Sequence, residues 1–176
     1  MKIILFICTL IMFTENSILF DFNDESRVRD WQIVDDGVMG GLSRGQFSIN
    51  AEGHGVFEGQ VSLENNGGFS SVRHGLHDVN VSSDRSIVLH IKGDGKQYQF
   101  RVKDSMNHYY SFIHAFQTSG DWQEIVIPLN SMYASFRGRK VNVPNFFSDQ
   151  IEEVRFLIAN KKMEEFKLLI DKIEIR

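Results

Sequence analysis

Two adjacent carboxylates, Asp35 and Asp36, are the first residues in this sequence whose type and spacing could support catalysis. Two carboxylic acids that face one glycosidic bond can hydrolyse it, one as the acid and the other as the base or nucleophile. Neighbouring residues of a strand point to opposite faces, so this pair converges only if the backbone turns at Gly37. Aspartates that cap a turn are the more frequent arrangement, and we expect that role here.

The segment Gly41-Leu42-Ser43-Arg44-Gly45 fits the G-x-S-x-G pattern of serine hydrolases, which place the serine on a turn between a strand and a helix. Residues 46–51 alternate like a strand instead of forming a helix, and the chain lacks the βα alternation that such hydrolases need. The sequence therefore predicts a Gly-rich turn around Ser43 and no nucleophile.

Metal and cofactor sites are not indicated by the spacing of their usual ligands. The six histidines are scattered, and the closest pair, His74 and His77, has no third ligand nearby, whereas zinc needs three or four. The segments Gly53-x-Gly55 and Gly93-x-Gly95 lack the third glycine and the following helix of a dinucleotide loop. We expect no metal, no cofactor and no catalytic residue, so the chain is predicted not to be an enzyme.

Short segments of alternating apolar residues run through the chain from Ile18 onward, and turns separate them. The alternation is seen in Ile87, Leu89 and Ile91, in Tyr98, Phe100 and Val102, in Ile125, Ile127 and Leu129, and in Val154, Phe156 and Ile158. No stretch of a dozen residues has the spacing of an amphipathic helix. Because many short strands must cover their edges, we expect an all-β fold, a two-sheet jelly-roll sandwich, as one domain over residues 18–176.

Two local features of these strands are predicted as well. Gly93-Asp94-Gly95-Lys96 is typical of a hairpin loop between strands. Near the C-terminus Phe166, Leu168 and Ile170 share one parity while Ile173 and Ile175 share the other, which indicates a bulge between the two groups.

Composition and charge limit the classes of partner. Apolar residues make up 42% and charged residues 24% of the chain, as in ordinary globular proteins, so the chain is expected to fold by itself. The formal net charge of −4 gives no basic footprint, so a nucleic-acid partner is not expected. Trp31, Trp122, Tyr109 and Tyr110 belong either to the core or to an exposed platform on which sugar rings stack.

The N-terminus has the shape of a secretory signal, with Met1-Lys2 followed by the apolar run Ile3 to Phe13. Eleven such residues are too few to span a bilayer as a helix, so no transmembrane span is predicted. We interpret residues 1–17 as a signal peptide, which predicts a periplasmic or secreted protein. If the segment is not a signal, the alternative is a cytoplasmic protein that reaches a membrane through its partner.

Two segments resemble the signature of a known family. Asp35 to Ser43 (DDGVMGGLS) is similar to one signature run of the complex I intermediate-associated protein 30 family, and Phe57 to Arg73 is similar to its most distinctive run. Further similar segments follow in the family's order, and the resemblance spans Leu19 to Ile175. It implies a galactose-binding-domain-like jelly roll, a fold that many carbohydrate-binding modules share.

The same resemblance implies a non-enzymatic assembly factor, a chaperone-like protein that holds immature subunits of respiratory complex I. Because Gly-rich turns let a backbone approach a partner closely, we expect the two segments to share one surface. The predicted binding residues are Asp35, Asp36, Ser43, Asn65, Asn66, Arg73, Arg101 and Arg139. Two alternatives remain open: the segments only fix two turns of the sandwich, or the chain is an exported carbohydrate-binding module that uses Tyr109, Tyr110 or Trp122 to bind a glycan.

Overall fold

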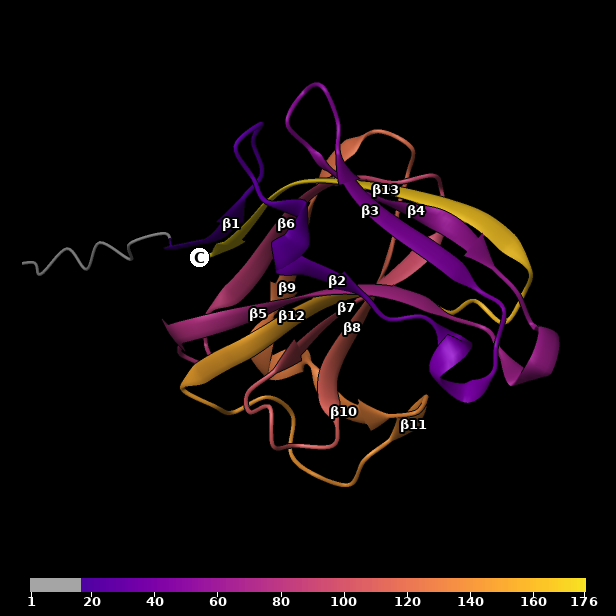
Figure 1. Ribbon diagram of the computed structural model, residues 1–176. Coiled ribbons are helices and arrows are strands. Elements are labelled where there is room, and N and C mark those ends of the chain that lie inside the picture. The colour runs from indigo at the N-terminus through magenta and orange to yellow at the C-terminus, as the bar shows by residue number, and fades with distance from the viewer. Residues whose placement is uncertain (1–16) are drawn as a thin grey trace, which may run out of the picture.

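The computed structural model describes residues 17–176, which form two antiparallel sheets joined by loops and short 3₁₀ turns (Figure 1). No α-helix occurs within these residues, and in this part of the chain no helix has the length and apolar character that crossing a membrane requires. The predicted all-β, two-sheet jelly-roll class is confirmed. Residues 1–16, with nearly all of the predicted signal peptide, lie outside the described residues.

The six-stranded sheet is built around the C-terminal strand. Its order is β3-β4-β13-β6-β9, and β1 pairs with the far half of β13. The register of β13 against β6 shifts between Ile170 and Lys172, which confirms the predicted bulge. The strands are β1 (Ser17–Asp21), β3 (Arg44–Ile49), β4 (Gly55–Val61), β6 (Ser86–Lys92), β9 (Trp122–Pro128) and β13 (Glu164–Ile175).

The seven-stranded sheet has the order β11-β10-β8-β7-β12-β5-β2. Its middle strands are long, whereas its edge strands β11 and β2 have two and three residues. The strands are β2 (Trp31–Ile33), β5 (Ser70–Asn80), β7 (Gln97–Lys103), β8 (Ser111–Gln117), β10 (Tyr133–Phe136), β11 (Arg139–Lys140) and β12 (Gln150–Ile158).

The core lies between the two sheets and takes alternate residues from both. Leu89 and Ile91 of β6 are fully buried, as are Tyr98 and Phe100 of β7, whereas residues between them face outward. Trp31 is also in the core, stacked on Phe47 with ring centroids 5.3 Å apart. Burying a large apolar side chain contributes about 1.5–3 kcal/mol, so this alternation supplies the main driving force for pairing the sheets.

The hairpin predicted at residues 93–96 is wrong, because β6 and β7 belong to different sheets. The segment is instead a crossover loop between them. Asp94 fixes it by accepting hydrogen bonds from the Tyr98 hydroxyl at 3.0 Å and from the Lys167 backbone N–H at 2.9 Å. A strand of either sheet buries alternate residues in the same core, so the local pattern does not distinguish a hairpin from a crossover.

Candidate functional site

The first signature segment is organised around the buried carboxylate of Asp36. This residue begins the 3₁₀ turn Asp36–Met39 and has no exposed surface. Its carboxylate accepts hydrogen bonds from the Ser43 N–H at 3.0 Å and from the Ser43 hydroxyl at 2.5 Å. It also accepts from the backbone N–H groups of Gly68 at 2.6 Å and Phe69 at 3.2 Å, which belong to the second signature segment.

These hydrogen bonds determine how Asp36 titrates. Burial alone raises the pKa of a carboxyl group, because it disfavours the charged form. The hydrogen bonds from the Ser43 side chain and from the Gly68, Phe69 and Ser43 backbones outweigh that effect and hold the pKa of Asp36 below its ordinary value. The residue is therefore an ionised structural acceptor at neutral pH.

Asp35 makes the second link between the same segments. Its carboxylate accepts hydrogen bonds from the Gly45 N–H at 2.9 Å and from the Ser70 hydroxyl at 2.6 Å. We call Asp35 and Asp36, with these donors, the aspartate clamp. A Cβ atom at Gly41 would overlap the Asp36 carboxylate, and one at Gly45 would overlap the Ser70 hydroxyl, so the clamp requires glycine at both positions.

The aspartate clamp explains why the serine and carboxylate motifs are not arranged for catalysis. The Ser43 side chain is 6% exposed, and its hydroxyl accepts from the Ser62 N–H at 2.9 Å while it donates to Asp36. Strand β3 follows Ser43 directly, as the sequence predicted, so the serine does not sit at a strand-to-helix turn. Asp36 and Ser43 hold two loops together, and being buried they do not belong to an exposed binding surface.

Asn65 and Asn66 are exposed in the short turn Glu64–Asn66 that follows β4. Both have left-handed backbone angles, with φ of 54° and 61°. Asn tolerates that region better than other residues with a Cβ atom. Their placement is therefore explained by the turn, two residues before the clamp contact at Gly68.

Arg73 and Arg101 lie elsewhere, on the outer face of the seven-stranded sheet. Arg101 of β7 pairs directly with Arg155 of β12, and Arg155 pairs directly with Arg73 of β5. Residues paired directly across strands point to the same face, with Cα atoms about 4.5–5.5 Å apart. Three arginines therefore stand side by side across three strands, and we call them the arginine row.

One carboxylate serves two members of the row. Glu153 is 2% exposed, and its two oxygens lie 3.2 Å from the Arg73 guanidinium and 3.0 Å from the Arg155 guanidinium. Arg101 instead donates to the Gln99 side-chain oxygen, at 3.1 and 2.6 Å. Among residues 17–176 no carboxylate forms an ion pair with Arg101. Burial and the charge of Arg155 lower the pKa of Arg101 to about 10, so it stays charged at neutral pH.

Arg139 is separated from the arginine row. It lies in the edge strand β11, exposed, with β10 and β8 between it and β7. At about 4.8 Å per strand, three strand spacings place its backbone at least about 14 Å from that of Arg101. The predicted residues therefore fall into an interior clamp, an exposed turn, a row on one sheet face and an outlying edge position.

The aromatic residues proposed for sugar stacking do not form one platform. Tyr109 is 64% exposed in the loop before β8 and packs edge-on against Phe136 at 5.2 Å. Trp122 is 45% exposed at the start of β9 in the other sheet and packs on His54 at 4.7 Å. The full length of β8 separates the two, so a single sugar ring cannot contact both.

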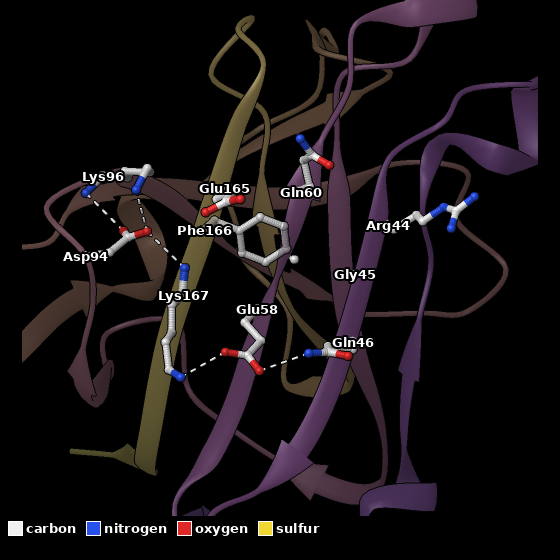
Figure 2. Close-up of a pocket in the computed structure, with 11 residues that line it drawn as sticks. Arg44, Gly45, Gln46, Glu58, Gln60, Asp94, Lys96, Glu165, Phe166 and Lys167 are labelled. Carbon is white, nitrogen blue, oxygen red and sulfur yellow. Dashed lines mark hydrogen bonds and ion pairs between the residues drawn. The ribbon is translucent and has the colours of Figure 1, made fainter.

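A groove of about 580 Å³ crosses the outer face of the six-stranded sheet, along β3, β4 and β13. Its central charges are already paired, as Figure 2 shows. Glu58 contacts the Lys167 ammonium at 2.9 Å and accepts from Gln46 at 2.9 Å, while Asp94 accepts from Lys96 at 2.6 Å. The side chain of Arg44 points away from these pairs (Figure 2).

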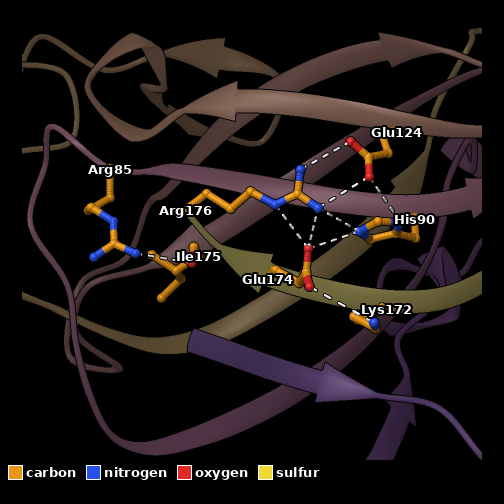
Figure 3. A network of polar contacts seen from close by, with 7 residues as sticks. All are labelled: Arg85, His90, Glu124, Lys172, Glu174, Ile175 and Arg176. Carbon is orange, nitrogen blue, oxygen red and sulfur yellow. Dashed lines mark hydrogen bonds and ion pairs between the residues drawn. The ribbon is translucent and has the colours of Figure 1, made fainter. Parts of the chain in front are cut away.

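A second polar network lies on the same sheet and is likewise satisfied (Figure 3). Glu174 accepts from His90 at 3.0 Å and from Arg176 at 2.7 Å, and Arg176 also reaches Glu124 at 3.2 Å. The hydrogen bond from His90, with Arg176, lowers the pKa of Glu174. Within residues 17–176 no group of three or more His, Cys, Asp or Glu side chains is placed to hold a metal ion.

Sequence reasoning missed Arg155, the middle member of the arginine row, and Glu153, the carboxylate that pairs with Arg155 and Arg73. Both alternate with the buried residues Val154 and Phe156, so their outward direction was predictable. Their proximity to Arg101 and Arg73 was not predictable, because it depends on pairing of β12 with both β7 and β5.

Comparison with solved structures supports the fold. A family 11 carbohydrate-binding module from Clostridium thermocellum, solved with a β-1,3-1,4-mixed-linked tetrasaccharide, superposes with a TM-score of 0.67 at 18% identity, covering 91% of this chain and 94% of that one. A mutant of a family 29 carbohydrate-binding module superposes with a TM-score of 0.56 at 9% identity, covering 92% and 91%. At such identities the similarity shows the galactose-binding-like jelly-roll fold alone.

Comparison of sequences identifies the family. Complex I intermediate-associated protein 30, mitochondrial, of Drosophila melanogaster is 24% identical over 147 residues, which are 71% of this chain and 50% of that protein. The chain thus spans about half the length of this curated relative. The family model for complex I intermediate-associated protein 30 (CIA30) matches residues 20–170, which contain the aspartate clamp and the arginine row. The chain therefore belongs to the complex I intermediate-associated protein 30 family.

Proposed function

We propose that this chain acts by binding and not by catalysis, and that it holds a protein partner on the outer face of the seven-stranded sheet. The observation that carries the proposal is the arginine row, in which Arg101 is charged, partly buried and, among residues 17–176, not paired with a carboxylate. In a chain of net charge −4 this is a local positive face. Membership of an assembly-factor family supports a protein as the partner.

Exposed apolar side chains near this face support the same conclusion. Tyr133 faces the same side as Arg101, through Ile113, and is 37% exposed. Met106, in the loop that follows β7, is 50% exposed, and Phe147, in the loop before β12 at the same end of the sheet, is 86% exposed. Arginine, tyrosine, phenylalanine and methionine are enriched at protein interfaces, where they supply much of the binding energy.

A photo-cross-linking experiment in native cells tests the location of the partner. Ala115 of β8 is exposed and pairs with Gln99, so a photoreactive residue at position 115 reports contacts of the outer face. Gln46, exposed on the other sheet, is the matched control position. We expect one defined protein cross-linked at 115 and absent at 46, with respiratory complex I subunits as the first candidates. Equal labelling at both positions would contradict the proposal.

Glycan binding is the second candidate, favoured by the structural likeness to a module solved with a mixed-linkage tetrasaccharide and by the exposed ring of Tyr109. Exposed aromatic side chains stack on sugar faces. Electrophoresis through gels containing mixed-linkage β-glucan tests it. This candidate predicts retardation that Tyr109→Ala abolishes, with Trp122→Ala as the comparison on the other sheet. Unchanged mobility in the gel would exclude this glycan as the ligand.

Two observations point to different locations for this protein. The curated relative is named as mitochondrial, whereas the segment Ile3 to Phe13 predicts export of this chain. We propose that the chain is exported and meets its partner outside the cytoplasm. Cell fractionation with N-terminal sequencing of the mature protein tests this. An N-terminus beyond residue 13 in an extracytoplasmic fraction is the expected result. An intact Met1 in the cytoplasm would contradict it.

A further inference from the structure

The arginine row is an unusual local arrangement because it places like charges directly opposite each other. Such pairs across neighbouring strands are destabilising, and opposite charges are the favourable choice. Arg101, Arg155 and Arg73 nevertheless occupy consecutive positions of one cross-strand line. A local arrangement that opposes stability, and that the fold compensates only in part, is characteristic of a functional site.

The compensation is present on one side of the row only. Glu153 lies between Arg73 and Arg155, with one oxygen toward each. No described carboxylate takes the equivalent place between Arg155 and Arg101. Lys103 lies two residues from Arg101 on β7 and adds another positive charge. It stands opposite Glu153 in register, but its ammonium donates to the Met106 carbonyl at 3.3 Å and not to that carboxylate. The Arg101 end of the row therefore has an excess of positive charge.

The donors left on Arg101 define what can bind there. Its Nε and one terminal nitrogen donate to Gln99, which holds the guanidinium in one orientation. The other terminal nitrogen, Nη1, makes no hydrogen bond within residues 17–176. A guanidinium that is already oriented presents its remaining N–H groups as a fork, which matches the two oxygens of a carboxylate. The neutral oxygen of Gln99 orients Arg101 without neutralising it.

We infer that Arg101 and Arg155 bind the carboxylate of an acidic side chain of the partner protein, in the position that mirrors Glu153 across Arg155. This inference rests on the proposed function and names the chemistry of the partner. A protein carboxylate is favoured over the carboxylate of an acidic glycan because apolar Tyr133 and Met106 flank the row, and a polypeptide covers such side chains together with the charge.

A titration with a defined acidic peptide tests the inference without any cellular partner. The probe is fluorescein-labelled hexaglutamate at low salt, with hexaglutamine as the uncharged control and polygalacturonate as the acidic glycan. We expect Arg101→Gln to weaken hexaglutamate binding at least about tenfold, the loss that one charge-assisted contact of about 1.4 kcal/mol represents. Arg44→Gln removes the same charge from the opposite sheet and is the matched control, expected to bind as the wild type does.

Stability separates a binding role from a structural one. Removing Arg101 also removes its repulsion of Arg155, so Arg101→Gln is expected to unfold at the same or a higher urea concentration than the wild type. Arg101→Lys keeps the charge without the fork and is expected to bind with intermediate affinity. Loss of stability together with loss of binding would show that Arg101 supports the fold and would overturn the inference.

The remaining outcomes are distinct. Polygalacturonate binding that depends on Arg101, without hexaglutamate binding, would assign the site to a glycan and overturn the protein assignment. Hexaglutamate binding that Arg101→Gln leaves unchanged would overturn the site itself. If cross-linking at position 115 persists while hexaglutamate does not bind, the proposed function stands and this inference fails. If hexaglutamate binds through Arg101 but position 115 captures nothing, the carboxylate site stands and the proposed function fails.

Discussion

Asp36 and Arg101 are both charged side chains withdrawn from solvent, and they differ in what surrounds them. Asp36 receives hydrogen bonds from two backbone N–H groups of one segment and from the N–H and hydroxyl of Ser43. Arg101 has one neutral acceptor, Gln99, and a positively charged neighbour. A buried charge whose partners all lie within the fold supports structure, whereas one whose partners are incomplete is available to a ligand.

Replacing Asp36 with Asn tests the structural role at the scale of one residue. The amide has one acceptor oxygen for the donors that the carboxylate satisfies, so Asp36→Asn is expected to cost about 2–4 kcal/mol of unfolding free energy. Urea denaturation at pH 7 measures this cost. A change below about 0.5 kcal/mol, typical of a surface site, would contradict the clamp.

The same variant gives a pH dependence with a defined sign. The pKa of Asp36 is lowered by folding, so its contribution to stability is complete above the unfolded pKa of about 3.9 and is lost as the pH falls through the lower folded value. The stability difference between wild type and Asp36→Asn should therefore narrow below about pH 4. A difference that stays constant from pH 7 to pH 2 would show that ionisation of Asp36 does not contribute.

At the scale of elements, the aspartate clamp explains glycine in a loop where conformation alone does not require it. Gly41 does not have a left-handed backbone, yet a Cβ atom there would meet the Asp36 carboxylate. Gly37 lies in the same loop, in the 3₁₀ turn, and a Cβ atom there would meet nothing within 4 Å. The two glycines therefore form a matched pair that separates crowding from flexibility.

Alanine at these two positions should give different results. Gly41→Ala is expected to destabilise the protein by about 1–3 kcal/mol, because the clamp must shift to accommodate the methyl group. Gly37→Ala is expected to change stability by no more than about 0.5–1 kcal/mol, and in the stabilising direction. Thermal unfolding of both variants measures the difference. Equal destabilisation would mean that the loop needs glycine for flexibility.

The strands themselves were predictable from sequence, and their partners were less so. Alternation in β6 and β7 identified both strands and the residues that face the core, because a side chain's face follows directly from its parity. Val88, of the opposite parity in β6, is buried as well, which the alternation did not predict. Parity also revealed the bulge in β13. The crossover at residues 93–96 was missed because the two strands share one core from opposite sides, and only long-range pairing shows which sheet each joins.

At the scale of the whole molecule, the buried apolar residues of both sheets form one shared core, so neither sheet has a separate core. Sheets that share one core are expected to unfold together. Calorimetry should therefore show one transition whose calorimetric and van't Hoff enthalpies agree, with the near-ultraviolet signal of buried Trp31 lost at the same temperature. Two separate transitions would divide residues 18–176 into more than one cooperative unit.

The candidate site shows where sequence reasoning reaches its limit. The eight predicted residues included Arg73 and Arg101, because charge and turn chemistry are visible along the chain. Burial of Asp36 and Ser43, and the joining of Arg101 to Arg155, depend on contacts between strands far apart in sequence. The family resemblance identified the fold correctly. The two segments that carry the resemblance are the ones that the aspartate clamp joins, so they determine how two loops of the sandwich pack.

The short edge strands of the seven-stranded sheet limit the ways in which this sheet can bind another protein. Strands β11 and β2 offer two and three residues, too few unpaired backbone groups to template a strand from another chain. Recognition at these two strands must then use side chains and not backbone pairing. A few substitutions on the outer face would suffice to exchange one partner for another, with every backbone hydrogen bond preserved. Related proteins with the same clamp can therefore differ in what they bind.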